Sequence, residues 1–211
     1  MTMDMAELER RCGEKLAAAG GDAAHGLEHV RRVVTNARAL AATEGARLEI
    51  VLPAAWLHDC VSVPKDSPLR AAASRLAAAQ AVEWLREWGW PEVLLPDIAH
   101  AIEAHSFSAG IAPRTIEAKV VQDADRLDAL GAVGLARCLM LGGELGRPLY
   151  AALDPFCEQR PPDDRAACVD HFYAKLLTLE DTMQTAGGRA EARRRTEFLR
   201  QFLAELRREL A

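Results

Sequence analysis

Apolar residues recur every three or four positions along most of the chain, which is the spacing of one face of an α-helix. Leu8, Cys12 and Leu16 show this spacing in the first such stretch. Glycines and prolines interrupt the pattern and mark its boundaries. The pattern predicts helices over residues 4–19, 25–44, 48–59, 69–88, 92–104, 115–137, 164–183 and 190–210.

The third of these helices is almost entirely apolar after Glu49, and Pro53 breaks or starts it. A helix that is apolar on all sides is buried, so we expect this one at the centre of the fold. Residues 139–155 hold several glycines and are expected to be irregular. Because no repeat or linker divides the chain, the pattern predicts an all-α fold, a single compact domain of about eight helices over residues 1–211.

Composition and charge narrow the classes of partner. Half of the 211 residues are apolar and only 5% are aromatic, as is typical of a helical protein. The formal net charge is −5, so the chain has no overall basic field to hold long nucleic acid. A small phosphorylated ligand is compatible with this charge, because a local cluster of cations can bind it.

The five cysteines are scattered and form no CxxC pair, which indicates reduced thiols in the cytosol. Residues 1–8 have no hydrophobic core of a secretion signal. No uncharged apolar stretch reaches the roughly 18 residues that a membrane span needs. We therefore expect a cytoplasmic protein without a membrane segment.

The apolar run of the third helix ends in His58 and Asp59. An imidazole and a carboxylate on adjacent residues are two good ligands for a divalent cation. For an isolated pair, the commoner interpretation is an ordinary helix end, where His58 caps a carbonyl and Asp59 is solvated. The remaining sequence has to decide between the two.

Two other segments offer further ligands. His25 and His29 are four residues apart at the start of the second helix, which places them on one face as a metal motif or as surface imidazoles. The sixth helix carries three carboxylates among apolar residues, Asp123, Asp125 and Asp128. Asp125 and Asp128 are expected to share a face. Buried carboxylates need a cation or donors, and Arg126 and Lys119 could serve as well as a metal.

The order His29, His58-Asp59, Asp125 in an all-helical chain resembles the HD superfamily of metal-dependent phosphohydrolases. The likeness to the bacterial YedJ/YpgQ-like branch covers roughly residues 20–210, with the signature region at about 25–130 and a C-terminal helical extension over 156–211. The segments that carry this second likeness are 104–108, 119–132, 154–156 and 171–177.

The resemblance implies that His29, His58, Asp59 and Asp125 are metal ligands. Two imidazoles and two carboxylates suit Mn²⁺ or Mg²⁺ and also Fe²⁺, Co²⁺ or Ni²⁺. Members with two metals use two additional histidines between the His-Asp pair and the last Asp. Here that interval holds only His100 and His105, both on one predicted helix. In the two-metal members one such histidine would be expected earlier, in the helix that begins near Leu69, and that helix has none, so one ion is expected.

Other site residues are less specific. Asp128 is a candidate general base, and His105 is a candidate phosphate donor or proton shuttle, or else a helix-end cap. The candidates for contact with substrate phosphate are His25, Lys65, Arg126, His171 and Lys175, each with the alternative of a solvated or ion-paired side chain. Some nucleotidases of the superfamily carry a Glu where this chain has Ser62.

The sequence therefore predicts a divalent-metal-dependent phosphohydrolase. Its substrate would be a nucleotide or another small phosphate ester or anhydride, attacked by metal-activated water. One alternative is a non-catalytic, nucleotide-binding or regulatory module, and another is a di-iron HD oxygenase. Nothing in the sequence decides between a monomer and a homodimer.

Overall fold

The computed structural model describes residues 4–19, 26–61, 63, 67, 69, 72–106 and 109–211. These residues form nine α-helices and two 3₁₀ helices and contain no strand, which confirms the all-α prediction. They divide into two compact units, which we call the first unit, Met1–Asp125, and the second unit, Arg126–Ala211. That the whole chain forms a single domain stays a prediction. No helix among the described residues is long and apolar enough to cross a membrane.

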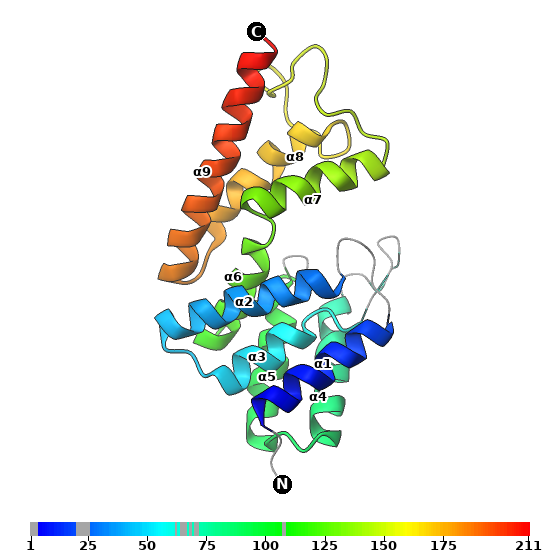
Figure 1. The fold of residues 1–211 in the computed structure, drawn as a ribbon, viewed down its shortest axis with the longest axis vertical. Coiled ribbons are helices and arrows are strands. Elements are labelled where there is room, and N and C mark those ends of the chain that lie inside the picture. Colours follow the sequence, from blue (N-terminus) through cyan, green and yellow to red (C-terminus); the bar gives the residue numbers. More distant parts are fainter. Residues whose placement is uncertain are drawn as a thin grey trace. The chain divides into compact units, whose positions relative to one another are not determined.

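The first unit is built from helices that surround a short central one (Figure 1). Its elements are α1 (Met5–Ala19), α2 (Leu27–Glu44), α3 (Leu48–Leu57), α4 (Ala73–Glu87), the 3₁₀ helix η2 (Glu92–Leu94), α5 (Leu95–His105) and most of α6 (Ile116–Leu127). Residues 50–57 of α3 are all buried, and α3 packs against α1, α2, α4 and α5. The predicted buried central helix is therefore confirmed, and it runs through Pro53 without ending there.

Polar contacts fix α6 within the first unit. The Asn36 side chain on α2 donates to the carbonyl of Ala124 at 3.2 Å. Gln122 on α6 donates to the carbonyl of Ala104, near the end of α5, at 2.6 Å. These two bonds tie the part of α6 that carries Asp125 to the helices on either side of it.

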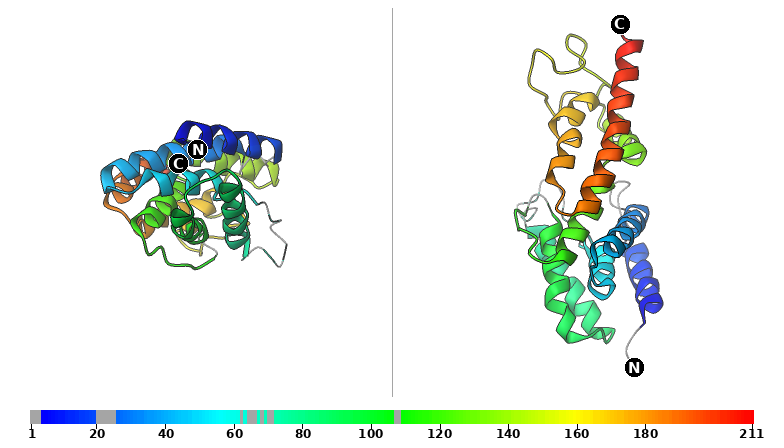
Figure 2. Two further views of the ribbon diagram at one scale, coloured as in Figure 1. Left: turned by 90° about the horizontal axis from the view of Figure 1, so that it is seen from below. Right: turned by 90° about the vertical axis from the view of Figure 1, so that its left-hand side faces the viewer.

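The second unit contains α7 (Gly131–Glu144), α8 (Cys168–Ala174), the 3₁₀ helix η3 (Leu176–Thr182) and α9 (Ala186–Glu209). The long α9 packs on α7 and η3, and α8 packs on the same two elements (Figure 2).

Three predictions of secondary structure in this region were wrong. The sixth helix ends at Leu127 instead of Arg137, and a new helix starts at Gly131, whose positive φ of 69° breaks the run. Residues 139–144, predicted to be irregular, belong to α7. Gly142 is buried there, and a Cβ on it would lie 2.1 Å from the sulfur of Cys168, so this glycine serves close helix packing.

The helix predicted over 164–183 is also shorter than expected. Only Cys168–Ala174 is α-helical, and η3 follows it. Lys175 separates the two elements with φ −141° and ψ −59°, which lies outside the helical region.

Candidate metal centre

His58 is the residue that ends α3, and its side chain is completely buried. Its Nδ1 lies 2.8 Å from the carbonyl oxygen of Ala55. Because a carbonyl can only accept, Nδ1 carries the proton, and Nε2 keeps its lone pair. The helix end thus fixes both the orientation and the tautomer of this imidazole, as is usual for metal-binding histidines.

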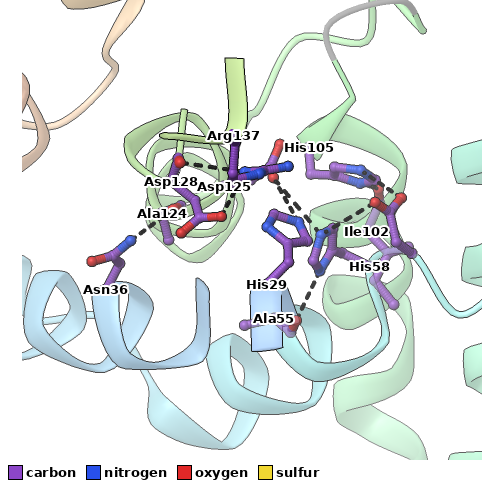
Figure 3. Close-up of polar contacts among 11 residues, drawn as sticks. His29, Asn36, Ala55, His58, Ile102, His105, Ala124, Asp125, Asp128 and Arg137 are labelled. Carbon is purple, nitrogen blue, oxygen red and sulfur yellow. Dashed lines mark hydrogen bonds and ion pairs between the residues drawn. The ribbon is translucent and has the colours of Figure 1, made fainter. Parts of the chain in front are cut away.

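One group of side chains lies on the Asp125 side of His58 (Figure 3). His29 comes from the first turns of α2 and is buried. The distances to Asp125 Oδ1 are 3.4 Å from His29 Nε2 and 3.8 Å from His58 Nε2. The rings of His29 and His58 are edge to face, with centroids 5.4 Å apart. Three helices, α2, α3 and α6, therefore bring these three residues together.

A second group shares His58 and adds Asp59 and His105. His58 Nε2 lies 3.5 Å from one oxygen of Asp59, and His105 Nε2 lies 3.4 Å from the other. His105 is the last residue of α5, and its Nδ1 lies 2.6 Å from the carbonyl of Ile102, three residues earlier. His58 and His105 are thus built alike, each at a helix end with Nδ1 bound to a backbone carbonyl.

The distances in both groups fit a divalent ion. The nitrogen–oxygen separations of 3.4 to 3.8 Å are longer than ordinary hydrogen bonds. Two ligands that each lie about 2.1 Å from an ion are themselves about 3 to 4 Å apart. His58 Nε2 is buried, and no described residue forms a hydrogen bond with it. Imidazole nitrogens and carboxylate oxygens together suit divalent transition metals.

The charges of the cluster also shape its pKa values. Burial lowers the pKa of His58, although the charge of Asp59 opposes it. Burial alone would lower the pKa of His105, but the negative carboxylate of Asp59 that faces it outweighs burial and raises the pKa. Burial alone would raise the pKa of Asp125, yet the facing imidazole of His29 and the charges of the other imidazoles hold this pKa low. The carboxylate of Asp125 is therefore ionised and can receive a cation.

Comparison with known proteins identifies the family. A model of the HD domain matches residues 26–130. The uncharacterized protein YpgQ of Bacillus subtilis (strain 168) is 34% identical over 190 residues, which are 88% of this chain and 84% of YpgQ.

The chain belongs to the HD domain family.

Solved structures agree with this assignment. Bacillus subtilis YpgQ in complex with ADP is 32% identical and superposes with a TM-score of 0.74, covering 96% of this chain and 97% of that one. A Bacillus thuringiensis protein described as an HD-superfamily hydrolase is 31% identical, with a TM-score of 0.72 over 96% and 98% of the two chains. The all-helical fold is therefore shared with other HD proteins along nearly the whole chain.

The structure places the remaining predicted HD-site residues in different surroundings. His25, Lys65 and Ser62 lie outside the described residues. Asp128 lies beyond the end of α6, so the expectation that it shares a helical face with Asp125 was wrong. The Asp128 carboxylate is buried and accepts a 2.6 Å bond from Arg137 within the second unit.

The other predicted phosphate contacts also belong to the second unit. Arg126 donates to the carbonyl of Thr182 at 2.6 Å, and His171 forms an ion pair with Asp164. Lys175 is exposed. The helix α8 ends at Ala174, just before Lys175. That these residues bind substrate stays a prediction.

The sequence predicted His105 as a phosphate donor or proton shuttle near the site, or else as a helix-end cap, and did not place it against Asp59. The available signal was its resemblance to His58, since each histidine follows an apolar helical run and ends the helix. His100, one helix turn or more earlier, has a separate use: its Nε2 accepts the backbone N–H of Arg114 at 3.0 Å.

Proposed function

We propose that this chain is a divalent-metal-dependent phosphohydrolase that acts on a nucleotide or another small phosphate ester or anhydride. The observation that carries the proposal is the pair of His–Asp groups that share the buried His58, with separations that suit an ion. The HD-superfamily hydrolase among its structural relatives supports the reaction class.

In this proposal His29, His58, Asp59 and Asp125 hold the ion. A divalent ion there supplies Lewis acidity, which lowers the pKa of water and polarises a phosphoryl oxygen. The protein orients the ligands in advance, because the Nδ1 of His58 is fixed by the Ala55 carbonyl. One ion is the expected number, since the two groups share one ring nitrogen of His58 and a nitrogen lone pair binds a single ion.

The substrate class rests on the relatives. YpgQ, which is similar over nearly its whole length, was solved with ADP bound. A nucleotide is therefore the substrate class we propose, with phosphate oxygens placed near the ion. His25, Lys65, Arg126, His171 and Lys175 are the proposed sources of positive charge for the phosphates. His105 and Asp128 are the proposed residues for proton transfer.

A second candidate function is nucleotide binding without turnover. The observation that favours it is the ion pair between Asp128 and Arg137, because a carboxylate held by arginine is a poor general base. The two candidates share the same ion site and differ only in whether product forms.

The test is a screen of nucleotides and simple phosphate esters against Mn²⁺, Mg²⁺, Co²⁺ and Ni²⁺, with phosphate or pyrophosphate release as the readout. We expect metal-dependent release that His58→Ala and Asp59→Ala abolish. The control is His100→Gln, on α5 but bonded to Arg114 instead of the cluster, which should stay active. Nucleotide binding without release under every metal would support the second candidate and contradict the first.

A further inference from the structure

Gln122 is a buried amide that joins the two helices on which the cluster depends. It lies on α6, three residues before Asp125, and only 3% of it is exposed. Its Nε2 donates to the carbonyl of Ala104, the residue before His105, at 2.6 Å. Since a carbonyl cannot donate, the amide orientation is fixed, and Oε1 faces away from Ala104.

The hydrogen bond of Gln122 contributes little net stability to the fold. Gln122 Oε1 is buried, and no residue in the described part of the chain forms a hydrogen bond with it. A buried acceptor without a partner costs about 1–3 kcal/mol. An apolar side chain of similar size would avoid that cost, so the advantage of glutamine has to come from where its amide holds the backbone.

The backbone that it holds carries His105. The last carbonyls of a helix have no partner inside the helix, which leaves the end of α5 poorly fixed by itself. Two side chains take these carbonyls: His105 uses the carbonyl of Ile102, and Gln122 uses that of Ala104. Gln122 thereby ties the end of α5 to α6, close to Asp125, because positions three apart are neighbours on a helix.

The two groups of the cluster need that connection. Asp125 reaches His58 from α6, whereas His105 reaches Asp59 from α5. One ion can use both groups only if the ends of these helices keep a fixed distance. One oxygen of the Asp59 carboxylate faces His58 and the other faces His105. A shift of His105 would therefore let the carboxylate rotate.

We propose that Gln122 is a positioning residue for the divalent cation: by holding the end of α5 against α6, it keeps His105 on Asp59 while Asp125 stays beside His29 and His58. The inference rests on the proposed function, because it takes the two groups as one cation site. Gln122 acts through the backbone and through His105, without touching the ion or the substrate.

The experiment compares Gln122→Leu and Gln122→Met with the wild type in the full-length, metal-stripped chain. Both variants remove the donor and also the buried Oε1. We expect Mn²⁺ affinity, measured from the signal of unbound Mn²⁺ in electron paramagnetic resonance, to fall by about 10-fold or more, as is usual when a residue that orients a ligand is lost. Thermal unfolding without metal should change little, because the two hydrogen-bond effects offset each other.

A matched control removes a similar bond at the opposite end of α3. Trp90 is buried and donates from Nε1 to the carbonyl of Glu49 at 3.2 Å. Trp90→Phe should lower the unfolding temperature and leave Mn²⁺ affinity unchanged.

Mn²⁺ affinity within twofold of the wild type in both Gln122 variants would overturn the inference, and so would a loss of stability as large as in Trp90→Phe with affinity retained. A wild-type chain that binds no Mn²⁺ gives a different result, because it would overturn the proposed function first. Using two variants guards against a single substitution that fails to fold.

Discussion

Two carboxylate sites, one in each unit, differ in which groups lie close to their negative charge. Asp170 in the second unit is completely buried, and each of its oxygens accepts a 2.6 Å bond from Arg160. It also accepts the backbone N–H of Asp163 at 3.0 Å and the thiol of Cys157 at 3.2 Å. In the first unit, the separations of Asp59 and Asp125 from the imidazoles are 3.4 Å or more.

The difference separates a structural carboxylate from a candidate ligand. Asp170 receives its cation from the chain itself at hydrogen-bond distance, which leaves no space for an ion. Asp59 and Asp125 face neutral ring nitrogens or partly charged ones across wider gaps. Carboxylates that face buried imidazole nitrogens across such gaps are suited to receive a cation from solution, and this is the central point of the account.

The largest expected effect comes from replacing a carboxylate with its amide in the first unit. Asp125→Asn keeps the shape of the side chain and removes the charge that faces His29 and His58. Divalent-metal affinity and phosphate release should fall by more than about 100-fold, beyond the usual loss of an outer partner. Isothermal titration with Mn²⁺ and an activity assay measure this. Unchanged Mn²⁺ affinity would show that Asp125, like Asp170, is not a metal ligand.

Metal should stabilise the chain. At a free Mn²⁺ concentration 100 times Kd, binding to the folded state alone adds about 2.7 kcal/mol to the free energy of unfolding. Thermal unfolding with Mn²⁺, and again after a chelator is added, should show a reversible rise in melting temperature. The rise should be absent in Asp125→Asn and complete in Asp170→Asn. A rise of equal size in both variants would place the ion elsewhere.

Asp170→Asn should have the opposite profile to Asp125→Asn. Removing one partner of a buried ion pair leaves Arg160 without its counter-charge, so the melting temperature should fall by roughly 5 °C or more. Mn²⁺ affinity should match the wild type, because the Asp170 carboxylate is already held by Arg160, the backbone of Asp163 and Cys157. A variant with weakened metal binding and unaltered stability would contradict the structural role of Asp170.

A smaller effect on the stability of the fold is expected when the pH is lowered. The hydrogen bond from Arg160 lowers the pKa of Asp170, with burial opposing it. A carboxyl whose folded pKa lies below its unfolded pKa of about 3.9 stabilises the fold fully at pH values above the unfolded pKa. This stabilisation is lost as the pH falls through the folded pKa. Between pH 5 and pH 3, roughly the window around the unfolded pKa, the wild type should therefore lose more stability than Asp170→Asn. The free energy of unfolding is measured with denaturant at each pH. If it falls equally with pH in the wild type and in Asp170→Asn, Asp170 is not the source of the acid sensitivity.

Local sequence predicted the parts of the site that depend on helix ends. The apolar run before His58 predicted a buried helix that ends at the His-Asp pair, and the structure has that helix. The choice of His29 and Asp125 came from the resemblance to the HD superfamily, and the fold brings both beside His58. The prediction of the helix succeeded because the spacing of apolar residues within a short segment indicates both the helix and its buried face.

Contacts between distant segments were not predictable in the same way. The position of His105 against Asp59 depends on how α5 packs on α3, and no local pattern encodes that distance. Likewise, Gly142 suggested a break but serves close packing on Cys168. The ion pair of Asp170 joins residues whose partnership is visible only once the loop before α8 is folded.

The most direct test of the central claim is a titration of the metal-stripped wild type with Co²⁺, followed by visible absorption. The account predicts saturation at one ion per chain, with ligand-field bands that are absent from Asp125→Asn and present in Asp170→Asn. A wild-type chain that produces no bands, or an Asp125→Asn spectrum identical to the wild type, would contradict the assignment of the His–Asp cluster as the metal centre.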